Sequence, residues 1–268
     1  LARLGVRSGF AGTLGADASG RRIVTYLEEA GVDTGGCRWV DGAASPVSQV
    51  WLNRRNGSRT IVHHRELEEF SARAFARLDL SAVRWLHFEG RNVQQVSAMM
   101  DDARRRTGEV TISLEAEKDR PGMDALIRRA DVLLCGRHFA LARGFDEAGP
   151  FLRAMRTLAP RTHCFLAWGE CGAHAIAPGL DAAIHEAARA PGPVVDTLGA
   201  GDTFNAGIIA ALLKGRDVAA ALAYAVELAG FKCTRRGLDD LEGHPELAVP
   251  LRTEQAPIRQ RNEPESPQ

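Results

Sequence analysis

Four consecutive residues, Gly199-Ala200-Gly201-Asp202, combine a turn that can bind an anion with a carboxylate. They precede a helix-forming run that continues to Leu213. A helix that begins in small residues leaves several backbone N–H groups unobstructed, and its dipole adds partial positive charge, so the turn can hold a phosphate. A carboxylate at an ordinary phosphate site would repel the ligand. Asp202 therefore fits a site of phosphoryl transfer, where it accepts the proton of the attacking hydroxyl.

Simpler interpretations of the same residues stay open. Asp is favoured at helix starts, and glycine turns are common in α/β proteins. The stretch lacks the lysine and the Gly-x-x-x-x-Gly-Lys-Ser/Thr spacing of a Walker A loop. No Gly-x-Gly-x-x-Gly follows the first predicted strand, which disfavours a dinucleotide-binding oxidoreductase.

The elements that position this turn alternate along the chain. Apolar runs typical of strands lie at 6–14, 83–90, 110–115, 131–135 and 163–169, with helical patterns between them, and 47–52 and 59–63 flank a turn at Asn56-Gly57. The alternation predicts an α/β fold with a mostly parallel sheet covered by helices on both faces. Ligands of such sheets bind beyond the carboxyl ends of the strands, so polar residues at those ends are the candidates for a site.

Composition excludes several classes of function. Lys plus Arg and Asp plus Glu number 34 each, so no basic surplus favours a nucleic-acid or anionic-membrane partner. No apolar run approaches the roughly 18 residues of a membrane span. The five cysteines are scattered, which argues against a disulfide framework or a zinc site and favours a cytoplasmic protein. We expect one domain over residues 1–249 and a disordered tail over 250–268.

The stretch "DTLGAGDTFNAG", residues 196–207, resembles the C-terminal signature of the PfkB (ribokinase-like) sugar kinases. The segments "NGSRTIVHH", "WLHFEGRN", "LEAEKDR" and "KCTRRGLDDL" resemble those of the ketohexokinase branch in the same order, and the similarity covers about residues 1–242. The resemblance implies a ribokinase-like three-layer sandwich. It also implies ATP-dependent transfer of a phosphoryl group to a primary hydroxyl of a ketose such as fructose.

The resemblance assigns roles to individual residues. Asp202 would be the catalytic base and contact the sugar, and Gly199, Ala200 and Gly201 would form an anion hole. Mg²⁺ would bridge the phosphates, with Glu115 and Glu117 as candidates to position it through water, and K⁺ would bind near the backbone around Asp196. ATP would be bound by residues from several segments: Arg91, Arg137, Gly169, Glu170, Cys171, Gly172, Asn205 and Cys233.

Some of these residues have a structural alternative. Arg91 could be a surface arginine, and Gly169–Gly172 could be a plain turn between strands. Cys233 could be a small buried side chain. His63, His64 and His138 have no partner at metal-ligand spacing and are interpreted as polar strand-end or surface residues.

The sequence also departs from the family pattern. The Asn-x-x-Glu motif of many members is replaced by "CGRHFA" at 135–140, where Arg137 offers a basic residue. No counterpart of the family's opening strand, lid strands and Gly-Gly-Asn segment is recognised, so we expect the N-terminal strand, the lid and most sugar contacts to be largely absent. Two alternatives follow: a kinase for another sugar or a nucleoside, and a catalytically impaired nucleotide-binding remnant. A homodimer is expected where the lid strands are present.

Overall fold

The computed structural model describes residues 1–52, 59–239 and 241, and within them the chain forms two compact units. One unit combines Leu1–Arg7 with the described residues from 80 to 241, and the other is formed by the described residues of Ser8–Asp79. The predicted turn at Asn56-Gly57 and the tail 250–268 lie outside the described residues. No helix among the residues described has both the length and the apolar character needed to cross a membrane.

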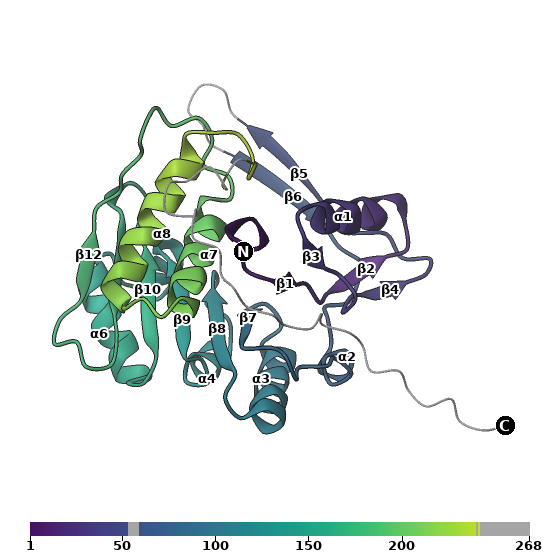
Figure 1. The fold of residues 1–268 in the computed structure, drawn as a ribbon, viewed down its shortest axis with the longest axis horizontal. Coiled ribbons are helices and arrows are strands. Elements are labelled where there is room, and N and C mark those ends of the chain that lie inside the picture. The colour runs from purple at the N-terminus through teal and green to yellow at the C-terminus, as the bar shows by residue number, and fades with distance from the viewer. Residues whose placement is uncertain (53–58, 240, 242–268) are drawn as a thin grey trace. The chain divides into compact units, whose positions relative to one another are not determined.

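The larger unit contains a six-stranded sheet in the order β12-β11-β10-β9-β8-β7 (Figure 1). Strands β7 to β10 are parallel, whereas β11 and β12 are antiparallel to their neighbours. The sheet is therefore mostly parallel, as predicted, and the four predicted strands of this unit are confirmed with small changes of their ends. The strands are β7 (Trp85–Glu89), β8 (Thr111–Ala116), β9 (Val132–Gly136), β10 (His163–Ala167), β11 (Ala173–Ile176) and β12 (Ile184–Glu186).

Helices cover both faces of this sheet (Figure 1). Because alternate residues of a strand point to opposite faces, Val132, Leu134 and Phe165 pack into one core with the two last helices. On the other face, α5 packs on β9, and α6 packs on β10. The helices are α3 (Val93–Thr107), α4 (Met123–Ile127), α5 (Arg137–Ala142), α6 (Ala148–Leu158), α7 (Ala200–Leu213) and α8 (Val218–Cys233), with short 3₁₀ helices η1 (Ala2–Leu4) and η2 (Gly169–Cys171).

Helices α7 and α8 lie against each other along much of their length. Gly207 permits a close approach of the two helices, since a Cβ added there would lie 2.8 Å from the Cα of Ala225. Both helices are rich in buried apolar residues, including Ile208, Ile209 and Leu228. The helix that begins at the Gly-Ala-Gly stretch is thus fixed from two sides, by the sheet and by α8.

The described residues of the smaller unit form three pairs of strands and two helices. β1 pairs with β3 and β2 with β4, both in parallel, while β5 and β6 form the predicted antiparallel hairpin. The single strand expected at 6–14 is wrong: the segment forms two short strands, because each pairs with a different partner. The elements are β1 (Ser8–Gly9), β2 (Thr13–Gly15), α1 (Ala18–Glu29), β3 (Val32–Asp33), β4 (Arg38–Val40), β5 (Val47–Leu52), β6 (Arg59–His64) and α2 (Ala72–Phe75).

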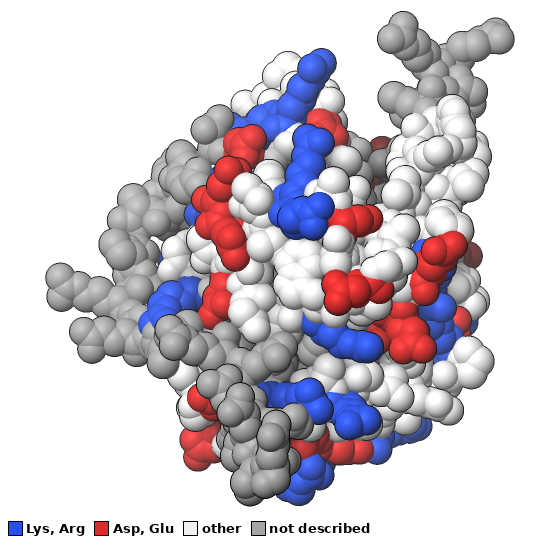
Figure 2. Space-filling view, turned by 90° about the vertical axis from the view of Figure 1, so that its right-hand side faces the viewer, with Lys and Arg blue, Asp and Glu red and all other residues white. Residues whose placement is uncertain are grey.

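The surface charges are mixed. Figure 2 shows one face of the molecule, on which Lys and Arg side chains are interspersed with Asp and Glu side chains. This distribution agrees with the equal numbers of acidic and basic residues in the sequence.

Candidate functional site

The start of α7 presents open backbone donors. Gly199 caps the helix in the left-handed conformation, with φ of 78°, and α7 begins at Ala200, so Asp202 lies in its first turn. The Ala200 amide donates to the Thr197 carbonyl at 3.2 Å. Within the described part of the chain, the amides of Gly201 and Asp202 have no hydrogen-bond acceptor. These two N–H groups are available to an anion, and the helix dipole favours one there.

A cavity of about 310 Å³, which we call the Asp202 cavity, lies beside this helix start. It brings together five of the residues predicted from the sequence, namely Gly201, Asp202, Arg91, Glu115 and Glu117. Its lining therefore contains four carboxylates and three cations. The full lining is Glu89, Gly90, Arg91, Glu115, Glu117, Lys118, Arg120, Gly201 and Asp202.

The cations of the cavity differ in their partners. The Arg91 guanidinium forms an ion pair with the Glu89 carboxylate. The side chains of Lys118 and Arg120 form no hydrogen bond or ion pair with any residue that the structure describes, so both are available to a phosphate. Sequence reasoning gave neither a role, although Lys118 lies among the polar residues just beyond β8, where such sheets bind ligands.

Glu115, at the end of β8, is the most perturbed acid of the cavity. Its Oε1 accepts a hydrogen bond of 3.0 Å from the side-chain amide of Asn205 on α7. Burial raises the pKa of Glu115, and the negative charges of Asp202 and Glu89 add to the effect, which together bring the pKa to about 7. Near neutral pH this carboxyl therefore holds a proton for much of the time, beside a second carboxylate that faces the cavity.

The side chain of His87 lies next to that of Glu115. Its Nε2 lies 3.9 Å from Glu115 Oε2, and its Nδ1 lies 2.8 Å from the hydroxyl of Ser113, which also accepts a hydrogen bond from Trp85 Nε1. Burial lowers the pKa of His87 to about 4. The imidazole is therefore uncharged at neutral pH and does not offset the charge of Glu115.

The predicted loop Gly169–Gly172 forms a tight turn after β10. Both glycines have positive φ, 65° and 91°, and a Cβ on Gly172 would lie 2.0 Å from the Glu186 carbonyl oxygen. Arg137, at the start of α5, lies over the ring of Trp168, with 5.5 Å from Cζ to the ring centroid. Arg137 and the loop are therefore neighbours, but neither contributes to the lining of the Asp202 cavity. Glu170 and Cys171, between the glycines, are exposed.

Two further predicted residues hold the chain around α7. Asn205 is buried and joins α7 to β8 through Glu115. The Cys233 carbonyl, at the end of α8, accepts hydrogen bonds from the amides of Val195 and Asp196, at 2.8 and 3.1 Å. Burial raises the pKa of the Cys233 thiol. Among the described side chains, no group of three or more His, Cys, Asp or Glu residues is arranged to hold a metal.

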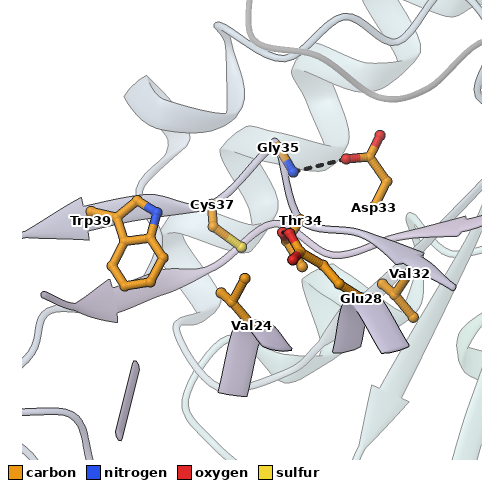
Figure 3. A pocket seen from close by; sticks show the side chains of 8 residues that line it. All are labelled: Val24, Glu28, Val32, Asp33, Thr34, Gly35, Cys37 and Trp39. Atoms are coloured by element: carbon orange, nitrogen blue, oxygen red, sulfur yellow. Dashed lines mark hydrogen bonds between the residues drawn. The ribbon is translucent and has the colours of Figure 1, made fainter. Parts of the chain in front are cut away.

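A second cavity, of about 570 Å³, lies in the smaller unit (Figure 3). Asp33 accepts a hydrogen bond from the Gly35 amide at 2.8 Å, and Glu28 accepts one from the Thr34 hydroxyl at 2.7 Å. Aliphatic and aromatic side chains, the thiol of Cys37 and these two acids line it. Its lining contains none of the residues predicted for phosphoryl transfer.

Comparison with known proteins relates the whole arrangement to sugar kinases. The sequence pattern of the pfkB family carbohydrate kinases matches residues 1–242. The chain is 33% identical to the ketohexokinase of Mus musculus over 249 residues, which covers 90% of this chain and 83% of that protein.

Solved structures share the fold at lower sequence identity. A protein assigned as ribokinase II from E. coli, solved with ATP and Mg²⁺, has a TM-score of 0.74 at 20% identity, covering 88% of this chain and 80% of that one. The adenosine kinase of Sinorhizobium meliloti has a TM-score of 0.73 at 20% identity, covering 92% and 80%. The predicted ribokinase-like fold is thereby confirmed.

Proposed function

Since the chain belongs to the pfkB family of carbohydrate kinases, which transfer a phosphoryl group to a sugar hydroxyl, we propose that it phosphorylates a primary hydroxyl of a ketose such as fructose. The similarity to mouse ketohexokinase supports a ketose. Ribose and adenosine are the competing acceptors, because kinases named for them share the fold. The family match spans both units, so we propose that together they make up one kinase domain, residues 1–249.

The observation that carries this proposal is the position of Asp202 beside an open amide donor. Asp202 and Gly201 line one cavity, and the Gly201 N–H has no acceptor within the residues described. In the proposed reaction Asp202 takes the proton of the sugar hydroxyl as it attacks. The amides at the start of α7 stabilise the charge that spreads over the phosphoryl oxygens. Gly199 and Ala200 contribute by forming the turn.

ATP and Mg²⁺ fit the chemistry of this cavity. Arg91, Lys118 and Arg120 supply positive charge for the phosphates, and guanidinium groups suit phosphate oxygens. The bound Mg²⁺ would neutralise charge between the phosphates. We propose that Glu115 and Glu117, which line the cavity, contact its water shell. A K⁺ site near Asp196 stays a prediction, tested by comparing turnover in potassium and sodium salts.

The remaining nucleotide contacts are proposed from their neighbourhood. Arg137 and the loop Gly169–Gly172 lie together beyond the ends of β9 and β10, where parallel sheets bind ligands. We place the nucleotide along this loop, with Glu170 and Cys171 exposed toward it, and with Asn205 and Cys233 at the end that adjoins α7 and α8.

Exposed apolar side chains support a homodimer. Val50, Trp51 and Val62 on the β5–β6 hairpin are each more than half exposed, which is typical of surfaces that bind another protein. We propose a second copy of this chain as the partner, and sedimentation velocity tests it.

The free thiols support a cytoplasmic location. All five cysteines are free, as expected in a reducing compartment.

Substitution of Asp202 tests the reaction. We expect Asp202→Asn to lower kcat by about 10²–10⁴-fold, because the general base is lost, while the affinity for ATP changes little. A coupled ADP-release assay with fructose, ribose and adenosine measures turnover, and calorimetry measures ATP binding. Asp101→Asn is the control, because Asp101 forms an exposed ion pair with Arg129 on the surface.

Three results would contradict the proposal. Wild-type protein that binds ATP but phosphorylates none of the three acceptors would indicate the nucleotide-binding remnant instead. An Asp202→Asn variant that loses ATP affinity in proportion to turnover would assign Asp202 a structural role. Turnover with adenosine and not with fructose would keep the kinase and replace the ketose.

A further inference from the structure

Lys232 is a lysine whose side chain is completely buried. It lies in the last turn of α8, and its exposed fraction is 0%. An ammonium group loses its hydration on burial and is tolerated only where other groups compensate its charge. A fully buried lysine therefore identifies a position where the protein requires a fixed positive charge or a fixed set of hydrogen bonds.

Asp196 provides that compensation. Lys232 Nζ donates to the Asp196 main-chain carbonyl at 2.8 Å and to its carboxylate Oδ2 at 3.0 Å. The other carboxylate oxygen accepts from the Leu198 amide at 2.9 Å, and Oδ2 also accepts from the Gly237 amide at 3.2 Å. The Leu198 amide, Lys232 and the Gly237 amide hold the pKa of Asp196 at about 2. Asp196 is therefore ionised at neutral pH.

The pair adjoins the segment that leads into α7. Asp196 precedes Gly199 by three residues, and the Cys233 carbonyl accepts hydrogen bonds from the Val195 and Asp196 amides. The chain that enters the helix is thus tied to the end of α8 by four hydrogen bonds that involve Asp196 or its neighbour. Lys232 is not among the residues that line the Asp202 cavity.

We propose that Lys232 is a positioning residue, which fixes the turn at Gly199–Gly201 and so aims the Gly201 amide and the Asp202 carboxylate at the transferring phosphoryl group. This inference rests on the proposed function of that turn. Positioning of this kind acts on the transition state more than on substrate binding, because displacement of a catalytic group by about 1 Å can cost about 10²-fold in rate. The charge of Lys232 is used within the protein, to neutralise Asp196.

The test compares three variants of the full chain. Lys232→Met removes the charge and both hydrogen bonds at similar length. Lys232→Gln removes the charge but keeps a donor for the Asp196 carbonyl. Val226→Ala is the matched control, because Val226 is buried on the same helix within the core cluster and lies six residues before Lys232 in the sequence. Thermal unfolding confirms that each variant is folded, and Lys232→Gln replaces Lys232→Met if the latter does not fold.

Two measurements are made on each variant. For Lys232→Met we expect kcat to fall about 10–100-fold while the KM for ATP changes less than about threefold, with partial recovery in Lys232→Gln. Hydrogen–deuterium exchange should accelerate in peptides that cover 194–204 and stay unchanged in β8 and β9. Val226→Ala should lower the melting temperature without either effect.

The exchange measurement separates this proposal from the proposed function, because it needs no substrate. Unchanged exchange over 194–204 in both Lys232 variants would overturn the positioning role. So would a loss of kcat in Val226→Ala as large as in Lys232→Met, since that would trace the effect to stability alone. If the wild-type protein phosphorylates no acceptor, the proposed function fails, and the exchange pattern alone decides whether Lys232 holds the turn.

Discussion

Replacing Glu115 by Gln tests the electrostatics of the Asp202 cavity without requiring activity. Gln keeps an oxygen that can accept the hydrogen bond from Asn205. It removes the negative charge of the carboxylate, which burial and the nearby Asp202 carboxylate disfavour. The folded protein holds the Glu115 proton more tightly than the unfolded chain does. The protonated Glu115 therefore contributes its full share of stability below about pH 4.5, and this share is lost as the pH rises through about 7. The Gln variant should therefore gain stability relative to wild type as the pH rises.

The size of the gain follows from the pKa. A value of about 7 in place of 4.5 corresponds to at most about 3 kcal/mol of unfolding free energy. The Glu115 side chain is 27% exposed, so water and salt reduce this ceiling. We expect Glu115→Gln to be more stable than wild type by about 1–2 kcal/mol at pH 8 and nearly equal to it at pH 4.5–5.

Urea unfolding at pH 5, 6, 7 and 8, followed by circular dichroism, measures the difference. Glu109→Gln is the control, because Glu109 is exposed and its replacement also removes one negative charge. A constant difference between Glu115→Gln and wild type at all four pH values would refute the reasoning. Loss of stability at pH 8 would also refute it, by showing that the Glu115 carboxylate is stabilised in the fold.

Four other substitutions give expected outcomes. Gly172→Ala should lower the free energy of unfolding by about 2–4 kcal/mol, because Gly172 has a positive φ and a Cβ there would collide with the Glu186 carbonyl. Gly169→Ala should lower it by only about 1 kcal/mol, because Gly169 has a positive φ but a Cβ there would meet nothing within 4 Å. Chemical denaturation compares the two variants. Asp17→Asn should lower the melting temperature at pH 7, because hydrogen bonds to the Asp17 carboxylate stabilise the fold and hold its pKa at about 2. The difference in melting temperature from wild type should shrink as the pH falls toward 2, because protonation of Asp17 removes this stabilisation. Gly201→Val should leave the fold intact, because a Cβ there has open space, and should weaken ATP binding by about tenfold in calorimetry; unchanged affinity would exclude a phosphate at this turn.

The sequence predicted those parts of the molecule that depend on neighbouring residues. Buried parallel strands appear as apolar runs, so β7 to β10 were found with small errors at their ends. The helix α7 was found because a glycine turn precedes a run of helix formers, although it begins two residues before Asp202. The segment 6–14 was predicted wrongly, because partner choice, rather than local pattern, divides it into two strands.

Contacts between distant segments could not be predicted in this way. The Asn205 amide meets Glu115 across 90 residues of sequence, and Lys232 meets Asp196 across 36. The contact of Asn205 with Glu115 arises because α7 packs beside β8, and that of Lys232 with Asp196 because α8 ends beside the segment that leads into α7. No spacing along the chain indicates either contact. The same holds for Arg120, which has an ordinary sequence context and faces the cavity only in the folded unit.

The close approach of Gly207 to Ala225 has a consequence for the order of folding. Helices α7 and α8 are consecutive and are joined by Lys214–Asp217 alone, so their contact closes a short loop at a small cost in chain entropy. The parallel strands, in contrast, pair only after long crossover connections have closed, which makes their pairing slow. Asp202 and Lys232 both belong to this local helical hairpin. The proposed catalytic base and the proposed positioning lysine therefore lie on a part of the larger unit that can assemble from local contacts.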